Sequence, residues 1–244
     1  MVILIFFVGH WYLSLFTQTF FLHRYAAHSM FTMSKTAERF FYLLTFIAQG
    51  SSYLSARAYG VMHRMHHAHA DTEEDPHSPA HDKNIIAMMW RTYQIYTSIF
   101  MEKVNVDKKF KIGVPDWASF DKIASSYTMR TLWIVVYFLF YWFFATEWWM
   151  FLLVPIHAVM GPFHGVIINW FAHKYGYENY EMENTSTNLM PWDIFMMGEG
   201  LHNNHHRHAT RPNFGVKKYE FDPTYPIIWI LNKIGVIQLR KNNI

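Results

Sequence analysis

Histidine is the residue type in this sequence with the greatest capacity for chemistry. The chain of 244 residues contains sixteen histidines and no cysteine. Nine of the histidines fall into four groups along the chain: His23 and His28; His63, His66 and His67; His173; and His202, His205 and His206. Neutral imidazole binds iron, zinc, copper or nickel, and nine imidazoles exceed what one ion can take. The groups therefore predict a site for two metal ions.

The spacing within each group indicates how the rings are presented. The pattern His-x-x-His-His occurs at 63–67 and again at 202–206. Spacing of i, i+3 and i+4 places three imidazoles on one face of a helix. His23 and His28 differ, because residues five apart lie about 140° from each other around an ideal helix. We therefore expect the helix to distort or end near these two residues.

Composition narrows the chemistry that such a site could perform. Without cysteine, the chain can have no disulfides, no thiolate metal site and no cysteine-ligated iron-sulfur cluster. None of the groups contains the His-Glu-x-x-His pairing, so metal-assisted peptide hydrolysis is poorly supported. Redox chemistry remains, and iron is the usual metal for activating O2. Zinc could replace the iron in overexpressed protein, because imidazole-rich sites accept it.

Three apolar runs are long enough to cross a bilayer, which takes about 17 to 25 residues. They cover residues 2–22, 128–146 and 148–172. The last two meet at a tight turn formed by Thr146 and Glu147. The first run lacks the charged start and cleavage pattern of a signal peptide, so we expect it to remain as an anchor. We expect a single domain, 1–244, with cytoplasmic segments at 23–127 and 173–244.

The distribution of positive charge orients these runs. All 21 Lys and Arg residues lie within residues 24–130 and 174–241. By the positive-inside rule both blocks are cytoplasmic, which puts the N-terminus outside and the histidine groups at the cytoplasmic face. We expect a multi-pass protein, most simply of a bacterial inner membrane.

Shorter apolar segments complete the expected architecture. The run 40–48 is too short to cross, and one crossing there would separate His28 from His63. We expect it, together with 84–100 and 226–237, to form interfacial or core-packing helices. The expected fold is an all-α integral membrane protein with about three transmembrane helices, interfacial helices and a cytoplasmic, His-rich, di-metal helical cap.

The other seven histidines have simpler explanations. His10, His157 and His164 lie inside spans, where hydrogen bonding between helices is the favoured role. An alternative is a bis-histidine haem electron carrier, in which His10 faces His157 or His164. We expect the remaining four to be solvated or to lie just outside the metal ligands: His69, His77, His81 and His208.

Charged residues supply further candidates. Metal-binding histidines usually donate their second ring N–H to a carboxylate or carbonyl. The candidate acceptors are Glu199, Asp71, Glu74 and Asp75. A phosphate-bearing head group could meet Arg57, Lys83 and Arg91. A cluster of lysines could dock an acidic electron carrier, or could simply face solvent: Lys103, Lys108, Lys109 and Lys111.

With these residues in view, the chain resembles the membrane fatty acyl desaturases, especially the stearoyl-CoA type delta-9 enzymes and their bacterial relatives. The likeness runs from about Thr19 to Val236. It is carried by the four histidine groups in their order and by their neighbours, which include Arg24, Asp71 to Pro79, Asn169, Gly176 and Gly198 to Leu201. One such group would be weak evidence, whereas four in this order are specific.

The resemblance implies a function and a site. In that family the nine matching histidines hold two irons, and the asparagine matching Asn169 reaches one metal through a water. It implies an oxidoreductase that uses O2 and two electrons to introduce a double bond, at the delta-9 position by analogy, into a saturated acyl chain. The substrate would be an acyl-CoA, acyl carrier protein or acyl-lipid, and membrane lipid, not nucleic acid, would surround the enzyme.

Three further points concern the number of spans, the electron donor and the alternative activity. The family usually has four spans and this chain has room for three, as if the first had been lost. The sequence shows no cytochrome b5 module, so a separate electron donor such as ferredoxin or cytochrome b5 is expected. A lipid or carotenoid hydroxylase or ketolase would use a similar iron centre, and product analysis would distinguish it.

Overall fold

The first span is a single long helix that changes its winding before it ends. The structure, a computed structural model, describes residues 1–240. Helix α1 (Val2–Thr17) continues directly into the π-helix η1 (Gln18–Ala27). Together they form a helix of 26 residues that is long and apolar enough to cross a membrane. The first span therefore ends at Ala27, five residues later than the sequence predicted.

The second and third spans differ in regularity. Helix α7 (Tyr127–Phe144) is straight, and the side chain of Ser126 caps it by accepting the N–H of Met129. After the expected turn come η3 (Trp148–Leu153), α8 (Val154–Ala158), α9 (Met160–Asn169) and η4 (Phe171–His173). This run bends by 67° at one break. Residues 1–240 therefore contain two unbroken helices that could span, or three candidates if the bent pair counts as one span.

The bend corrects the expectation of one continuous span over 148–172. Val159 lies at the break with a φ of −121° and a ψ of 24°, outside helical values. Pro162 follows three residues later and has no N–H to donate back into the preceding turn. A proline is tolerated in the first turn of a helix but not in its interior, so the chain starts a new helix at Met160.

The three longest of the remaining helices begin at a side-chain cap. Ser34 caps α2 (Lys35–Gln49), Ser55 caps α3 (Ala56–His69) and Asn84 caps α4 (Ile85–Phe100). As expected, α2 is not among the described helices that meet the requirements for a span. The shorter helices are η2 (Gly50–Ser52), α5 (Lys108–Lys111), α6 (Ala118–Ala124), α10 (His202–Arg207) and α11 (Thr224–Lys233).

A small sheet makes the all-α expectation wrong in one detail. Strands β1 (Phe31–Met33) and β2 (Ile237–Leu239) pair antiparallel, with Phe31 opposite Leu239. The helix expected over 226–237 ends at Lys233, because Gly235 adopts a φ of +77° that terminates it. The chain can then turn back as a strand, which ties the C-terminal segment to the residues just after His28.

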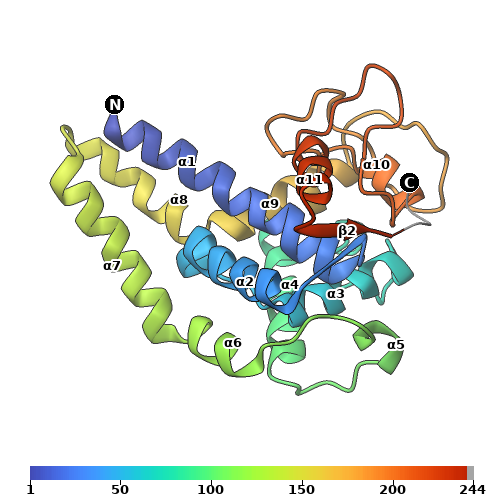
Figure 1. The fold of residues 1–244 in the computed structure, drawn as a ribbon, viewed down its shortest axis with the longest axis horizontal. Helices are drawn as coiled ribbons and strands as arrows, with labels where there is room; N and C mark the ends of the chain where they lie inside the picture. The colour runs from blue at the N-terminus through green and yellow to red at the C-terminus, as the bar shows by residue number, and fades with distance from the viewer. Residues whose placement is uncertain (241–244) are drawn as a thin grey trace.

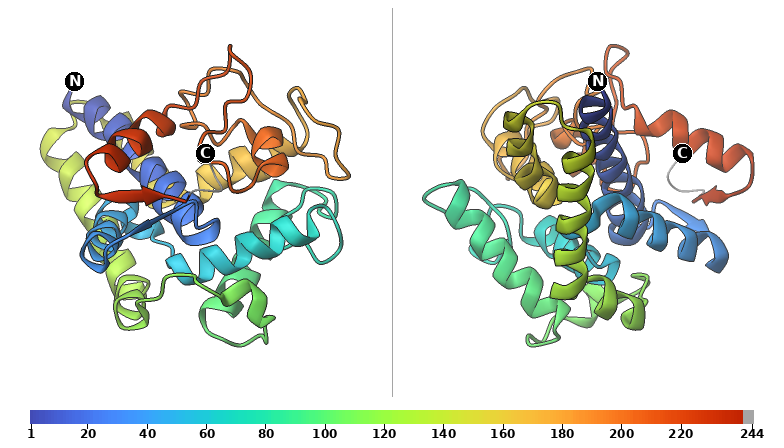
Figure 2. Two further views of the ribbon diagram at one scale, coloured as in Figure 1. Left: turned by 45° about the vertical axis from the view of Figure 1, so that its right-hand side comes forward. Right: turned by 90° about the vertical axis from the view of Figure 1, so that its left-hand side faces the viewer.

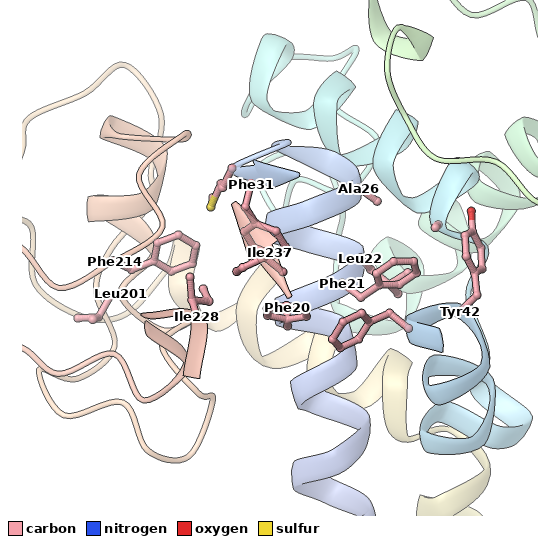
Figure 3. Packing of buried hydrophobic residues seen from close by; sticks show 13 residues of the cluster. Phe20, Phe21, Leu22, Ala26, Phe31, Tyr42, Leu201, Phe214, Ile228 and Ile237 are labelled. Carbon is pink, nitrogen blue, oxygen red and sulfur yellow. The ribbon is translucent and has the colours of Figure 1, made fainter. Parts of the chain in front are cut away.

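One buried cluster joins segments that are far apart in the sequence. Figure 3 shows Phe20, Phe21 and Leu22 of η1 between Tyr42 of α2 on one side and Phe214 and Ile228 on the other. All of these side chains are at least 99% buried. Burial of this much apolar surface holds the C-terminal region against η1, and it brings α10 to the end of the first span.

The overall arrangement separates the spans from the histidine-bearing helices. In Figures 1 and 2, α1, α7 and α8 gather at the end of the molecule that holds the N-terminus. Helices α3 and α10 lie at the opposite end, beside the last turns of η1. The fold therefore delivers the histidine groups to one end of the apolar helices.

Candidate metal centre

Helices α3 and α10 present their histidines as the spacing predicted, and the π-helix presents the other pair. A π-helix closes its hydrogen bonds between residues five apart, so such residues lie nearly above one another. Accordingly the N–H of His28 donates to the carbonyl of His23 at 3.0 Å. The two ring centroids are 4.8 Å apart. The distortion expected here is thus the π-helix itself, which lets a five-residue spacing bring two imidazoles together.

All nine predicted histidines meet, and they divide into two groups. Within each group the possible ligand atoms lie within 4.8 Å of one another. The five-histidine group contains His23, His28, His63, His67 and His205. The four-histidine group contains His66, His173, His202 and His206. Both α3 and α10 contribute to both groups, so the two sites must be adjacent.

The separations between ring nitrogens fit a metal ion in each group. Nε2 of His63 lies 2.9 Å from that of His28, and Nε2 of His66 lies 3.2 Å from that of His206. Two nitrogens bound to one ion at right angles, with bonds of about 2.1 Å, would be about 3.0 Å apart. The rings are therefore spaced as ligands around a shared ion, and all donors are imidazoles, which suits iron or zinc.

Burial keeps these imidazoles in the form that binds metal. The pKa values of His63, His67, His202, His205 and His206 lie well below the ordinary value, first because burial disfavours the charged ring and then because neighbouring histidines repel it. A neutral imidazole keeps a lone pair free for an ion.

Three of the four predicted carboxylates lie beside Nδ1 of a histidine ring and orient that ring. Glu199 Oε2 lies 2.6 Å from Nδ1 of His23, and both carboxylate oxygens of Asp75 lie 2.9 Å from Nδ1 of His66. Asp71 Oδ2 lies 3.4 Å from Nδ1 of His173. Such partners fix ring orientation and raise the basicity of a ligand.

Electrostatics within these pairs agree with that role. Burial alone would raise the pKa of Asp75, but the hydrogen bond and charge of His66 outweigh it, so the pKa is held below its usual range. The same competition lowers the pKa of Asp71, through His173.

The prediction for Glu74 was wrong, because this carboxylate is 75% exposed and pairs with His69 outside both groups.

Sequence reasoning assigned no role to Arg24, which is completely buried behind the five-histidine group. Its guanidinium donates to Asp222 at 2.7 Å and lies 3.4 Å from Glu199. It also stacks on Phe214, with its central carbon 3.8 Å from the ring centre. Arg24 thereby fixes the carboxylate that orients His23. The available signal was a charged residue directly after His23, at the end of an apolar run where charge is costly.

A mainly apolar cavity of about 440 Å³ meets the metal centre. His63, His202 and Glu199 line one part of it, and so does the predicted Asn169. Other walls come from α4 and α9, with Ile85, Ile86, Met89, Trp90, Tyr93, Tyr96, Gly161, Gly165 and Ile168. Within residues 40–54 only Leu54 lines the cavity, and no aromatic residue of that segment does. Instead α4 supplies the aromatic wall.

Two of the three histidines inside the spans, His10 and His157, pair with each other instead of joining the centre. Among residues 1–240 the ring nitrogens of the third, His164, have no hydrogen-bond partner. Nδ1 of His10 lies 2.5 Å from Nδ1 of His157, and Nε2 of His157 lies 2.9 Å from the Tyr141 hydroxyl. This is the expected hydrogen bonding between helices. It does not fit a haem, because nitrogens on opposite sides of one iron would be about 4 Å apart.

The other candidates lie apart from the two groups, with one exception. Arg91 is engaged by Asp82 and by the carbonyls of Asp75 and Ser78, and Arg57 by Glu102, Asp116 and the carbonyl of Phe100. Lys83 is exposed, as are His81 and His208. The exception is His77, which is 97% buried and whose ring centroid lies 4.2 Å from that of His66.

Comparison with known proteins agrees with this geometry. A family model described as "Fatty acid desaturase" matches residues 1–227. The "Delta-9 desaturase-like 3 protein" of Arabidopsis thaliana is 28% identical over 225 residues, covering 89% of this chain and 70% of the relative. The "Delta-9 desaturase-like 2 protein" of the same plant is 26% identical, with the same coverage.

A cyanobacterial relative carries the more specific description. The "sn-1 stearoyl-lipid 9-desaturase" of Anabaena variabilis is 26% identical over 215 residues, covering 88% of this chain and 74% of the relative. The family model extends over all four histidine groups and the apolar helices that position them. The chain therefore belongs to the fatty acid desaturase family and is an oxidoreductase.

Proposed function

We propose that this protein is an O2-dependent di-iron desaturase that introduces a double bond, at the delta-9 position, into a saturated fatty acyl chain. The proposal is supported above all by nine imidazoles that form two adjacent groups with metal-ligand spacing beside an apolar cavity. The five-histidine group would hold one iron and the four-histidine group the other. Asn169 lines the cavity, where it could reach one ion through a water.

The overall reaction balances with two electrons from outside. A –CH2–CH2– unit, O2, two electrons and two protons give –CH=CH– and two molecules of water. The two irons supply the oxidising power that breaks unactivated C–H bonds, which acid or base catalysis does not cleave. The protein holds the ring nitrogens with Glu199, Asp75 and Asp71, excludes bulk water and confines the acyl chain to the cavity.

An acyl chain is the substrate class that matches the cavity. Its α4 and α9 walls are mainly apolar or aromatic, and no lysine or arginine of residues 1–240 lines it. The cyanobacterial relative is named for a stearoyl-lipid. We therefore propose a long saturated acyl chain carried as acyl-lipid, acyl-CoA or acyl carrier protein. Arg57 and Arg91 are engaged within the protein, which leaves exposed Lys83 as the remaining candidate for a phosphate.

The apolar helices support a membrane location. Two described helices, or three with the bent pair, are long and apolar enough to cross. All Lys and Arg residues lie outside them except Arg24, near the end of the first helix, and Arg130, in the first turn of α7. We propose an N-terminus outside and a metal centre on the cytoplasmic side. Electrons would come from a separate ferredoxin or cytochrome b5. The lysines at 103–111 provide a positive surface for an acidic donor.

Fatty-acid analysis of whole cells tests this function directly. Cells with and without the expressed chain would be compared by gas chromatography and mass spectrometry, with the His66→Ala protein as the matched control. We expect monounsaturated acyl chains that depend on His66. A hydroxylated or keto product without any alkene would contradict desaturation and would favour a hydroxylase or ketolase.

A further inference from the structure

Four histidines line the cavity, and only two of them belong to the metal groups. His63 and His202 are ligands in our proposal, whereas His77 and His164 are outside both groups. His77 is 3% exposed, and neither of its ring nitrogens has a hydrogen-bond partner among residues 1–240. Buried polar groups almost always have partners, so an unpaired buried imidazole needs an explanation.

His77 stands where the cavity meets both groups. Its ring centroid is 4.2 Å from that of His66, in the four-histidine group, and 6.3 Å from that of His63, in the five-histidine group. Its ring nitrogen approaches within 4.8 Å of ligand atoms of His66 and Asp75. The same nitrogen does not lie within 4.8 Å of the ligand atoms of every histidine in the four-histidine group. The ring is thus adjacent to the metal ligands without completing their set.

The backbone fixes His77 while leaving its ring free. Its N–H donates to Asp75 Oδ1 at 3.0 Å. Arg91 binds the carbonyls of Asp75 and Ser78 on either side of it. The segment is therefore held rigidly by contacts that do not use the imidazole, which is the arrangement expected when a side chain is kept for an external partner.

The possible partners are few. A hydrocarbon chain in the cavity offers no hydrogen-bonding atom. A third cation between His66, Asp75 and His77 is disfavoured, because the Asp75 oxygens already accept from Nδ1 of His66 and from the backbone N–H groups of Asp71 and His77. A small oxygen ligand remains, since it can enter through the cavity and pair with an imidazole.

We propose that His77 is the hydrogen-bond donor that positions this small oxygen ligand, water or dioxygen, at the junction of the two histidine groups and the cavity. The inference rests on the proposed function, in which O2 reacts beside the acyl chain. A hydrogen bond at this point holds the ligand in place until the chain is oxidised. Without it, O2 is reduced by two electrons and two protons to hydrogen peroxide, and no alkene forms.

Azide, a small anionic ligand, provides a probe that does not depend on turnover. We would prepare iron-loaded wild-type protein, His77→Phe, His77→Gln and the matched control His164→Phe, which removes another buried cavity-lining imidazole. All four should contain two metal ions per chain. Azide titration by absorbance should show at least tenfold weaker binding for His77→Phe, partial recovery for His77→Gln, and wild-type affinity for His164→Phe.

Turnover gives the second readout. With a reductant and acyl substrate, His77→Phe should consume several-fold more O2 per double bond, with the excess recovered as hydrogen peroxide. His164→Phe should alter only the KM for the acyl chain and keep the wild-type ratio. If His77→Phe does not fold, His77→Leu carries the same expectation.

The possible outcomes separate the two hypotheses. Wild-type azide affinity and coupling in His77→Phe would overturn the assignment, because the ring would then serve only packing. Loss of one metal ion from that variant would also overturn it, since His77 would be a ligand. If wild-type protein forms no alkene while His77→Phe still loses azide affinity, the proposed desaturation fails and the role of His77 stands.

Discussion

Histidine is used in two different ways in this protein, and the contrast lies between its two ends. Within the spans, His10 pairs with His157, and His157 in turn pairs with Tyr141. At the opposite end, nine rings from four parts of the chain converge, and Nε2 of His205 lies 3.0 Å from the Nε2 atoms of both His23 and His67.

The contrast shows what distinguishes a metal centre from a structural histidine. Six of the nine rings at the centre are buried, as are His10 and His157, so burial alone does not distinguish the two uses. The difference is that three or more lone pairs point to one place, and that carboxylates hold the rings from behind. The paired histidines in the spans instead use their nitrogens to join α1, α7 and α8.

The sharpest test removes one ring from each of the two histidine groups and one from the pair in the spans. His205→Ala and His202→Ala each delete a ligand of one group, so each should lose a metal ion and abolish double-bond formation. His157→Phe should retain two metal ions per chain. Metal analysis of purified protein and fatty-acid analysis of cells would measure this. Full activity in either alanine variant would show that the groups do not form the centre.

Arg24→Met tests the support behind the five-histidine group. Removal of the guanidinium leaves Glu199 and Asp222 buried without a countercharge, which typically costs about 3–5 kcal/mol. A large fall in the midpoint of thermal unfolding is expected. Arg39→Met is the control, because Arg39 is exposed and stacks on Trp117. Equal effects of the two changes would argue against a central role for Arg24.

Asp75→Asn tests whether the carboxylates tune the rings. Loss of the charge behind His66 should weaken metal binding by about 10- to 100-fold, as for other partners of metal ligands. Competition with a chelator would measure the change for each purified variant. Glu74→Gln, one residue earlier and exposed, should bind metal like the wild type. A similar loss in both variants would point to a general effect of loop charge.

The smallest effect is expected at the paired histidines of the spans. Tyr141→Phe removes one hydrogen bond to His157 and should lower stability by about 1 kcal/mol. Metal content and azide affinity should stay at wild-type values, because this pair is separate from the centre. Any loss of metal here would show that the two ends of the molecule are coupled.

The sequence by itself determined which residues could bind metal and which segments are apolar enough to span a membrane. It predicted the nine imidazoles, helical presentation at 63–67 and 202–206, and three apolar runs, because these follow from local spacing and periodicity. Three of the four candidate carboxylates do contact ring nitrogens of the groups. These carboxylates could be found from the sequence because each lies a few residues from a histidine group along the chain.

Only the tertiary structure decided how these histidines, carboxylates and helices are arranged around the centre. It divides the rings into five and four, replaces one straight span by a helix bent at Val159, makes α4 the cavity wall, and places Arg24 and His77 beside the centre. These features depend on contacts such as that between His23 and His205, which are 182 residues apart. Local periodicity carries no information about such pairings, because they are fixed by packing across the whole fold.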